Sequence, residues 1–392
     1  MPAPAYLDHA ATSPIRPEVA ELLAPYFTGD RWGNPSSAHA FGRPAKVALE
    51  QARRELALAL GCEPAHVYFT SGGTEADNLA VIGAALAARR DGRRMRVAVS
   101  AIEHKAVLEA AHAVAALGGE QAVLPVHGDG TLDLDALDRE LAERPACVSV
   151  MWVNNETGVV QDVPELARRC AAAGVTFHTD GVQAIGKGRV LLRELAGGVL
   201  CTVSGHKLGA PKGCGALVVP KRSAIAPLQH GGGQQAGVRP GTENVAFAAA
   251  LARAVTLAVV EQEAEAARCA ALRDALEARL RAAVPELVVP GAGAPRAPHV
   301  LNVCVPGVEG AVVLLHLDLL GVCASGGSAC STGTAEPSHV LRAMGVAPEV
   351  ALGAVRLSVG HGTTMADVER CAEAFPVAVA RARQLAEALA RG

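Results

Sequence analysis

Asp180 and Lys207 are the residues of this sequence whose types and spacing are best suited to chemistry. Each follows an apolar run, in the segments FHTDGVQ and VLCTVSGHKLG, and 27 residues separate them. That separation leaves room for one helical crossover between neighbouring parallel strands, so both side chains can face one small cofactor. Pyridoxal phosphate (PLP) requires such a pair: an amine to react with its aldehyde and a carboxylate to keep its ring nitrogen protonated. The alternative interpretation makes Lys207 a surface lysine and Asp180 a helix cap.

Lysines are scarce, which leaves few candidates for lysine chemistry: they stand at positions 46, 105, 187, 207, 212 and 221. This scarcity favours a functional Lys207, as do its polar neighbours Ser204 and His206. His104, in the segment IEHK, can stack on a flat ring and move protons, although a lone histidine is more often structural.

The segment SGGTEADN (71–78) follows the strand-like VYFT and opens a predicted helix. The amides of Gly72, Gly73 and Thr74 can therefore face an anion at the positive end of that helix. The segment is neither GxxxxGK[ST] nor GxGxxG, which argues against a nucleoside-triphosphatase or a dinucleotide site. A phosphate site and a plain Gly-Gly turn are both compatible with these residues.

Cys330 lies in a run of small residues, 325–334, that lacks the apolar groups needed for packing. The composition predicts a mobile loop there and a reactive thiolate at Cys330. A buried, inert state is expected instead for Cys62, Cys147, Cys201, Cys304 and Cys323. The ten cysteines show no CxxC pair or other metal-type spacing, so no metal site is expected.

Arg356 lies in the apolar segment AVRLSVG, where a long cation must find an anion or reach solvent. A substrate carboxylate suits the two-pronged geometry of its guanidinium. An internal Asp or Glu partner remains an open alternative.

The composition predicts a large folded protein of the cytoplasm. Half of the 392 residues are hydrophobic and 19% are charged, which favours a packed core over disorder. The net charge is −3 with no long run of Lys and Arg, so neither nucleic acid nor a membrane is expected as a partner. The N-terminus lacks the basic start and apolar stretch of a signal peptide.

Short β-branched runs alternate with Ala-rich helical stretches, a pattern that predicts an α/β fold with a mostly parallel central sheet. The predicted strands are 67–70, 96–100, 147–153, 175–179, 200–204 and 216–219, and the predicted helices are 43–60, 76–88, 105–117 and 163–173. A long helix over 245–284 precedes strands 300–305 and 355–359 and helices 310–320 and 365–390. We predict a large α/β domain over 13–260 and a smaller α+β C-terminal domain that comprises 261–392 together with residues 1–12. The polar segments that follow strands should meet at the carboxyl edge of the sheet.

Nine short segments occur in order over nearly the whole chain: YLDHAAT, GNPSSAH, FTSGGTEADN, VNNETG, HTDGVQ, SGHK, RPGTENV, GSACS and RLSVG. In this combination they closely resemble the cysteine desulfurases of the NifS/IscS type. The resemblance implies the fold type I of PLP enzymes and a homodimer with its sites at the subunit interface. It also implies conversion of L-cysteine to L-alanine and an enzyme-bound persulfide.

The resemblance further implies a role for each matching residue. Lys207 would bind PLP and later remove the α-proton of L-cysteine, Asp180 would hold the ring nitrogen, and His104 would stack on the ring. Cys330 would take the substrate sulfur as a persulfide and pass it to acceptor proteins, such as an iron–sulfur cluster scaffold or a carrier for thio-modification. The other implied cofactor contacts are Gly73, Thr74, Asn155, Gln183, Ser204, His206 and, from the second subunit, Thr242; the implied substrate contacts are Arg356, Asn155 and Asn34.

The sequence departs from this family pattern at Gln235, Ala236, Pro240 and Ala210, where Glu, Arg, Ser and Gly are common. We expect these changes to affect loop geometry or acceptor choice more than the reacting groups. Two alternative functions remain. One is a selenocysteine lyase or another PLP enzyme of the same fold, and the other is a catalytically idle adaptor that retains the fold.

Overall fold

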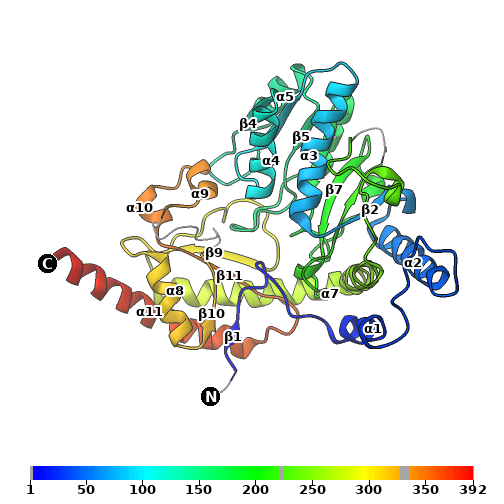
Figure 1. Cartoon of the computed structure of the whole chain (residues 1–392). Helices are drawn as coiled ribbons and strands as arrows, with labels where there is room; N and C mark the ends of the chain where they lie inside the picture. Colours follow the sequence, from blue (N-terminus) through cyan, green and yellow to red (C-terminus); the bar gives the residue numbers. More distant parts are fainter. Residues whose placement is uncertain (1–2, 221–224, 327–335, 392) are drawn as a thin grey trace.

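The computed structural model describes residues 3–220, 225–326 and 336–391, without the side chains of 389–391 (Figure 1). Cys330 and most of the small-residue run around it lie outside the described residues. The predictions about that loop and its thiol are therefore untested by the fold.

The centre of the molecule is a seven-stranded sheet with the order β2-β8-β7-β6-β5-β3-β4. Its strands are β2 (Val67–Thr70), β3 (Arg96–Ser100), β4 (Glu120–Leu124), β5 (Cys147–Ser149), β6 (Thr176–Asp180), β7 (Val199–Ser204) and β8 (Gly215–Val218). β8 runs antiparallel to both β2 and β7, while the other neighbours are parallel. The predicted mostly parallel sheet is confirmed.

Helices cover both faces of this sheet, because its inner strands carry apolar side chains on both sides. On one face, α3 (Gly73–Arg90) and α4 (Lys105–Ala116) pack with Val97 and Val99. On the other face, the intervening residue Ala98 belongs to a core that includes α2 (Gly42–Leu60), α5 (Leu134–Ala142), α6 (Val163–Ala173) and the first part of α7 (Val245–Ala283). The alternation follows the two-residue period of a strand.

A second core surrounds the end of α7 and the C-terminal elements. β9 (Val300–Cys304) pairs antiparallel with β11 (Ala354–Ser358), and β1 (Ala5–Tyr6) pairs parallel with β10 (Val322–Cys323). α8 (Gly310–Leu319) and α11 (Met365–Arg391) pack around them, and Ala5 and Leu7 belong to the same core. The predicted domain boundary at residue 260 falls within α7, which contributes side chains to both cores.

Several elements were absent from the sequence prediction: α1 (Pro17–Thr28), β4, α5, α9 (His339–Ala343) and α10 (Pro348–Ala351). The strand predicted over 147–153 is regular only over Cys147–Ser149. β4 is an edge strand with four of its five residues partly or fully exposed, so its sequence EQAVL lacks a buried-strand signature. One stretch of α7 is long and apolar enough to cross a membrane, yet α7 packs against α1, α2 and α11.

Candidate active site

A cavity of about 340 Å³ lies at the carboxyl ends of β6 and β7, beside the start of α3. Its walls comprise Ala10, Ala11, Gly73, Thr74, Asp77, His104, Asn155, Asp180, Val182, Ser204, His206, Lys207, Ser325 and Arg356. Eight of these residues were predicted as site residues, namely Gly73, Thr74, His104, Asn155, Asp180, Ser204, His206 and Lys207, and Arg356 was predicted as a substrate contact. The parallel sheet brings these distant segments together because parallel strands end at one edge.

Asp180 and Lys207 stand at the ends of adjacent strands. Asp180 ends β6 and its Oδ1 accepts the N–H of Val182 at 2.9 Å; β7 ends at Ser204, three residues before Lys207. Burial lowers the pKa of Lys207 to about 8, although the negative charge of Asp180 acts in the opposite direction. An amine with this pKa is partly neutral near pH 8, so it can act as a nucleophile and a proton acceptor.

The part of the cavity wall formed by the start of α3 can hold an anion. α3 begins at Gly73, where a Cβ atom would lie 3.3 Å from Val182 Cγ2 and 3.6 Å from Ser204 Cβ. The absence of a side chain therefore leaves the helix N-terminus close to Ser204, where backbone N–H groups attract negative charge. His206 adjoins this region, and burial lowers its pKa to about 4, so its ring is neutral.

His104 is the N-cap of α4, and its ring lines the cavity. Its Nδ1 accepts the N–H of Ala106 at 3.1 Å, which leaves the proton of the neutral ring on Nε2. Burial lowers the pKa of His104, so the neutral form prevails at pH 7. The cap thus fixes both the orientation and the tautomer of the ring.

Arg356 is almost fully buried, and two residues hold its guanidinium. Its Nη2 donates to Asp8 Oδ1 at 2.9 Å, and its Nη1 donates to the backbone oxygen of Asn155 at 3.0 Å. The internal acidic partner that the sequence left open is therefore present. Arg356 also lines the cavity, and its buried Nε has no hydrogen-bond partner within the described chain. A role for Arg356 in binding a substrate carboxylate stays a prediction.

Three predicted contacts do not line this cavity. Gln183 is buried behind it, where its Nε2 donates to the oxygen of Ala10 at 2.9 Å and its Oε1 accepts from His299 Nε2 at 3.0 Å. Asn34 and Thr242 do not line the cavity of their own chain. The roles assigned to these three residues stay predictions.

Two buried carboxyl groups were missed by the sequence analysis. Burial and the neighbouring Asp180 raise the pKa of Asp77 well above its usual value, and burial raises that of Glu103 to about 8. Glu103 Oε1 accepts from Ser100 Oγ at 2.6 Å and from the N–H of Met151 at 2.7 Å. Asp77 could have been found, because it follows Thr74 by three residues and so shares its helix face.

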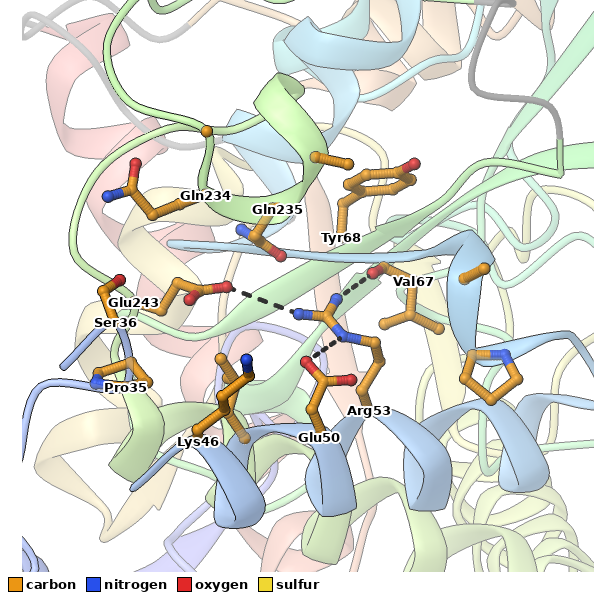
Figure 2. A pocket seen from close by; sticks show the side chains of 15 residues that line it. Pro35, Ser36, Lys46, Glu50, Arg53, Val67, Tyr68, Gln234, Gln235 and Glu243 are labelled. Carbon is orange, nitrogen blue, oxygen red and sulfur yellow. Dashed lines mark hydrogen bonds and ion pairs between the residues drawn. The ribbon is translucent and has the colours of Figure 1, made fainter. Parts of the chain in front are cut away.

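The unusual Gln235 has a structural explanation in a neighbouring region. Its side-chain amide accepts from the N–H of Phe69 at 2.6 Å and donates to the oxygen of Phe69 at 2.7 Å. Gln235 thus pairs with the edge strand β2 through both groups of its amide, which a glutamate could not do because it lacks the donor. Figure 2 shows Gln235 above this strand in a cavity of about 530 Å³, with Arg53 held between Glu50 and Glu243.

The nine described cysteines share one electrostatic feature. Burial raises the pKa of every one of them: Cys62, Cys147, Cys170, Cys201, Cys214, Cys269, Cys304, Cys323 and Cys371. The thiolate form is therefore disfavoured at each of these positions. Cys330 is the one remaining cysteine of the sequence.

Residues 5–371 match the family described as Aminotransferase class-V. The cysteine desulfurase IscS of Dictyoglomus turgidum is 42% identical over 363 residues, which cover 93% of this chain and 91% of that protein. This chain belongs to the cysteine desulfurase group of the class-V aminotransferases. Among solved structures, a NifS-like protein superposes with a TM-score of 0.88 at 30% identity. The superposition covers 96% of this chain and 100% of the NifS-like chain. SspA in complex with cysteine gives a TM-score of 0.78 at 29% identity, and this superposition covers 91% of this chain and 99% of the SspA chain.

Proposed function

We propose that this chain is a PLP-dependent cysteine desulfurase. The observation that carries the proposal is one cavity that joins the amine of Lys207, the carboxylate of Asp180 and the anion-attracting start of α3. PLP has a matching group for each of them: an aldehyde, a ring nitrogen and a phosphate. The class-V relatives named cysteine desulfurase support the same reaction.

The residues present fit PLP. Lys207 would hold the aldehyde carbon, Asp180 would accept a hydrogen bond from the protonated ring nitrogen, and the neutral ring of His104 can lie against a flat aromatic group. When bound, PLP supplies an electron sink for the bonds at the substrate α-carbon. Asp77 adjoins this site, and burial together with the neighbouring Asp180 raises its pKa, which favours the protonated acid at Asp77.

The chain also supplies groups for L-cysteine. The Arg356 guanidinium can bind the substrate carboxylate, since its buried Nε still lacks a partner within the described residues. Lys207, once released from the cofactor, can accept the α-proton and return it to the product, because its pKa of about 8 lies near physiological pH.

Cys330 would take the sulfur. Ser325 lines the cavity and precedes Cys330 by five residues, so chain geometry limits their separation to about 18 Å. The Cys330 thiolate would form a new S–S bond with the substrate sulfur as the Cβ–S bond breaks. The electron pair of that bond stays with Cβ, which takes up a proton and becomes the methyl group of L-alanine. The enzyme keeps the sulfur as a persulfide, and no external oxidant is needed.

We also infer that the protein is a homodimer in the cytoplasm and that it passes its sulfur to an acceptor such as an iron–sulfur cluster scaffold. Exposed aromatic side chains support the dimer, since aromatic residues are enriched at protein interfaces. Phe27, Trp32 and Phe41 are 67%, 66% and 49% exposed, and Trp32 stacks on Phe41. Sedimentation should give about twice the chain mass of 40.0 kDa.

Incubation of the purified enzyme with L-cysteine tests the proposed reaction. We expect L-alanine to form and the Cys330 peptide to gain the mass of one sulfur atom. Cys330→Ala should keep the visible absorbance of bound PLP and form no persulfide. Absence of alanine, or sulfide release undiminished by Cys330→Ala, would contradict the proposal.

A further inference from the structure

Two described residues flank Cys330 closely in sequence, and both are attached to the active-site region. Ser325 precedes Cys330 by five residues and pairs with β11: its N–H donates to the oxygen of Arg356 at 3.2 Å and its oxygen accepts from the N–H of Arg356 at 2.6 Å. Ser338 follows Cys330 by eight residues and begins the next helix. The attachment of Ser338 has no assigned purpose in the proposed reaction.

The Ser338 hydroxyl accepts hydrogen bonds from one helix and donates one to a neighbouring loop. Its Oγ accepts from the N–H groups of Val340 at 3.1 Å and Leu341 at 3.4 Å, which caps α9. The same hydroxyl donates to Glu156 Oε2 at 2.5 Å. Ser338 and Glu156 are 5% and 3% exposed, so water hardly competes for this contact.

A second set of contacts seats α9 on the large domain. His339 Nε2 donates to the backbone oxygen of Glu103 at 2.9 Å, directly before His104. Val340 and Met344 pack against Ile102 in a small apolar cluster. α9 therefore stands between β10 and β11 in sequence but lies against the loop before α4, at the carboxyl edge of the seven-stranded sheet (Figure 1).

The loop that carries Glu156 also carries cavity residues. Asn154 Oδ1 accepts the N–H groups of Glu156 and Thr157, both at 2.9 Å, and this holds the loop in one conformation. Asn155 lines the cavity, and its backbone oxygen accepts from Arg356. The loop 154–157 thus connects the cavity wall, Arg356 and the start of α9.

We propose that Glu156 is a positioning residue. Its hydrogen bond with Ser338 fixes, beside the cavity, the C-terminal end of the stretch between Ser325 and Ser338 that contains Cys330. This inference rests on the proposed function. A nucleophile held near its target reacts far faster than a loosely tethered one, and a displacement of about 1 Å can cost about 100-fold in rate. Glu156 should therefore affect the sulfur-transfer step and leave substrate binding unchanged.

Three variants separate this anchoring role from simple capping of α9. Ser338→Asp keeps a cap acceptor, removes the hydroxyl donor and places a second acid beside Glu156. Glu156→Gln keeps an oxygen that accepts from Ser338, so it should be nearly silent. In the double variant, the amide introduced by Glu156→Gln can donate to the carboxylate introduced by Ser338→Asp, which should restore the anchor.

Single-turnover kinetics supply the measurement. The absorbance change after mixing with L-cysteine reports substrate binding, and the mass of the Cys330 peptide reports persulfide formation. In Ser338→Asp we expect persulfide formation to slow by about 10- to 100-fold while the absorbance change keeps its rate within about twofold. Glu156→Gln and the double variant should both form persulfide within about threefold of the wild type.

Asp133→Ser is the matched control, because Asp133 caps α5 by accepting the N–H of Ala136 at 2.9 Å and does not line the cavity. In Asp133→Ser, the absorbance change and persulfide formation should both keep their wild-type rates. The proposal is wrong if Ser338→Asp forms persulfide at the wild-type rate, if the double variant is no faster than Ser338→Asp, or if both steps slow equally. If Ser338→Asp does not fold, Glu156→Ala must show the same split between the two rates. A wild-type protein that forms no persulfide would instead overturn the proposed function.

Discussion

Lys207 and Lys187 are two lysines whose pKa is lowered by burial, yet their surroundings differ in kind. Both line a second cavity of about 290 Å³. Lys207 also opens into the active-site cavity, where Asp180 lies within electrostatic reach. Lys187 does not line that cavity and sits instead at the junction where α7 meets the loops that carry Arg16 and His361. A lowered pKa alone therefore does not identify a catalytic lysine, and the neighbouring groups decide.

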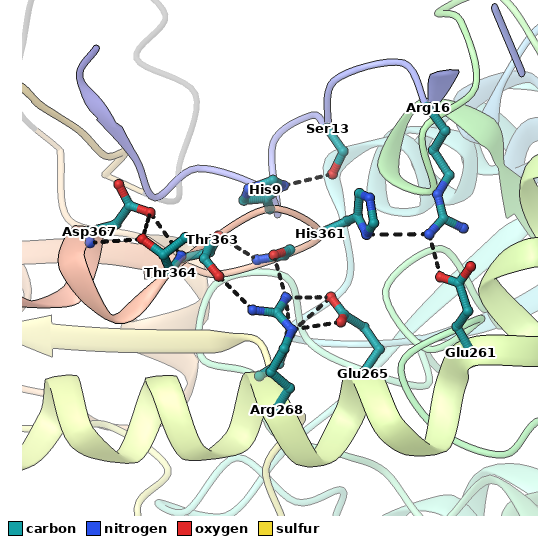
Figure 3. A network of polar contacts seen from close by, with 12 residues as sticks. His9, Ser13, Arg16, Glu261, Glu265, Arg268, His361, Thr363, Thr364 and Asp367 are labelled. Carbon is teal, nitrogen blue, oxygen red and sulfur yellow. Dashed lines mark hydrogen bonds and ion pairs between the residues drawn. The ribbon is translucent and has the colours of Figure 1, made fainter. Parts of the chain in front are cut away.

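The junction beside Lys187 is built from paired charges (Figure 3). Arg268 donates to Glu265 at 2.7 Å, to the oxygen of Gly360 at 2.8 Å and to that of Thr363 at 2.5 Å. Arg16 pairs with Glu261 and contacts His361. Partners of this kind hold segments together. In the active-site region, Asp77 Oδ1 and Glu103 Oε2 have no hydrogen-bond partner among the described residues.

Replacing each lysine should give the largest contrast between the two regions. Lys207→Ala removes both the covalent attachment and the proton acceptor, so we expect turnover to fall by about 100- to 10,000-fold with loss of the visible PLP absorbance. Lys187→Ala should keep that absorbance and stay within about tenfold of wild-type turnover. Equal losses of turnover in Lys207→Ala and Lys187→Ala would contradict the claim that only Lys207 is catalytic.

The two buried aspartates give the next contrast. Asp180→Asn removes the charge that faces the ring nitrogen and should lower turnover by about 100-fold. Asp77→Asn should stay within about threefold, because burial raises the pKa of Asp77 and so favours the protonated acid, which asparagine resembles. Turnover and the absorbance spectrum of both variants check this prediction. A loss in Asp77→Asn as large as that in Asp180→Asn would show that both groups carry charge.

The lowered pKa of Lys207 predicts the pH dependence of cofactor capture. Only the neutral amine attacks an aldehyde, so the rate at which cofactor-free protein takes up PLP should rise about tenfold per pH unit below pH 8 and level off above it. Stopped-flow absorbance measures this rate. A midpoint near the ordinary lysine value of 10.5 would contradict the lowered pKa.

The smallest effect concerns stability at the junction. Arg268→Met removes three interactions of a partly exposed side chain, and we expect the free energy of unfolding to fall by about 1–2 kcal/mol. Turnover should stay within about twofold, because Arg268 does not line the active-site cavity. Urea unfolding measures the free energy of unfolding, and steady-state kinetics measure the turnover. A large loss of turnover without a loss of stability would assign the junction a catalytic role.

The sequence predicted the parts of the site that follow local patterns. Asp180 and Lys207 end short apolar runs, and a parallel sheet must bring such ends to one edge. Gly73 stands in a Gly-Gly segment between a strand-like run and a predicted helix, so its position at a helix N-terminus was also visible. These residues meet in the cavity as expected.

Contacts between distant segments could not be predicted in the same way. Asp8 pairs with Arg356 and Ser338 with Glu156 across 348 and 182 residues, and no periodicity encodes such pairs. The edge strand β4 was missed because only its last residue is buried. Gln235 had been noted only as a departure from a pattern, and its pairing with Phe69 depends on how its loop meets β2.

Chemical trapping of the cofactor tests the central claim most directly. Borohydride reduction of the PLP-loaded protein fixes the cofactor on the lysine that holds it, and peptide mass analysis then identifies that lysine. The account predicts one pyridoxyl group on the peptide that contains Lys207 and none on the peptide that contains Lys187. A label on Lys187 or another lysine, or no label at all, would contradict it.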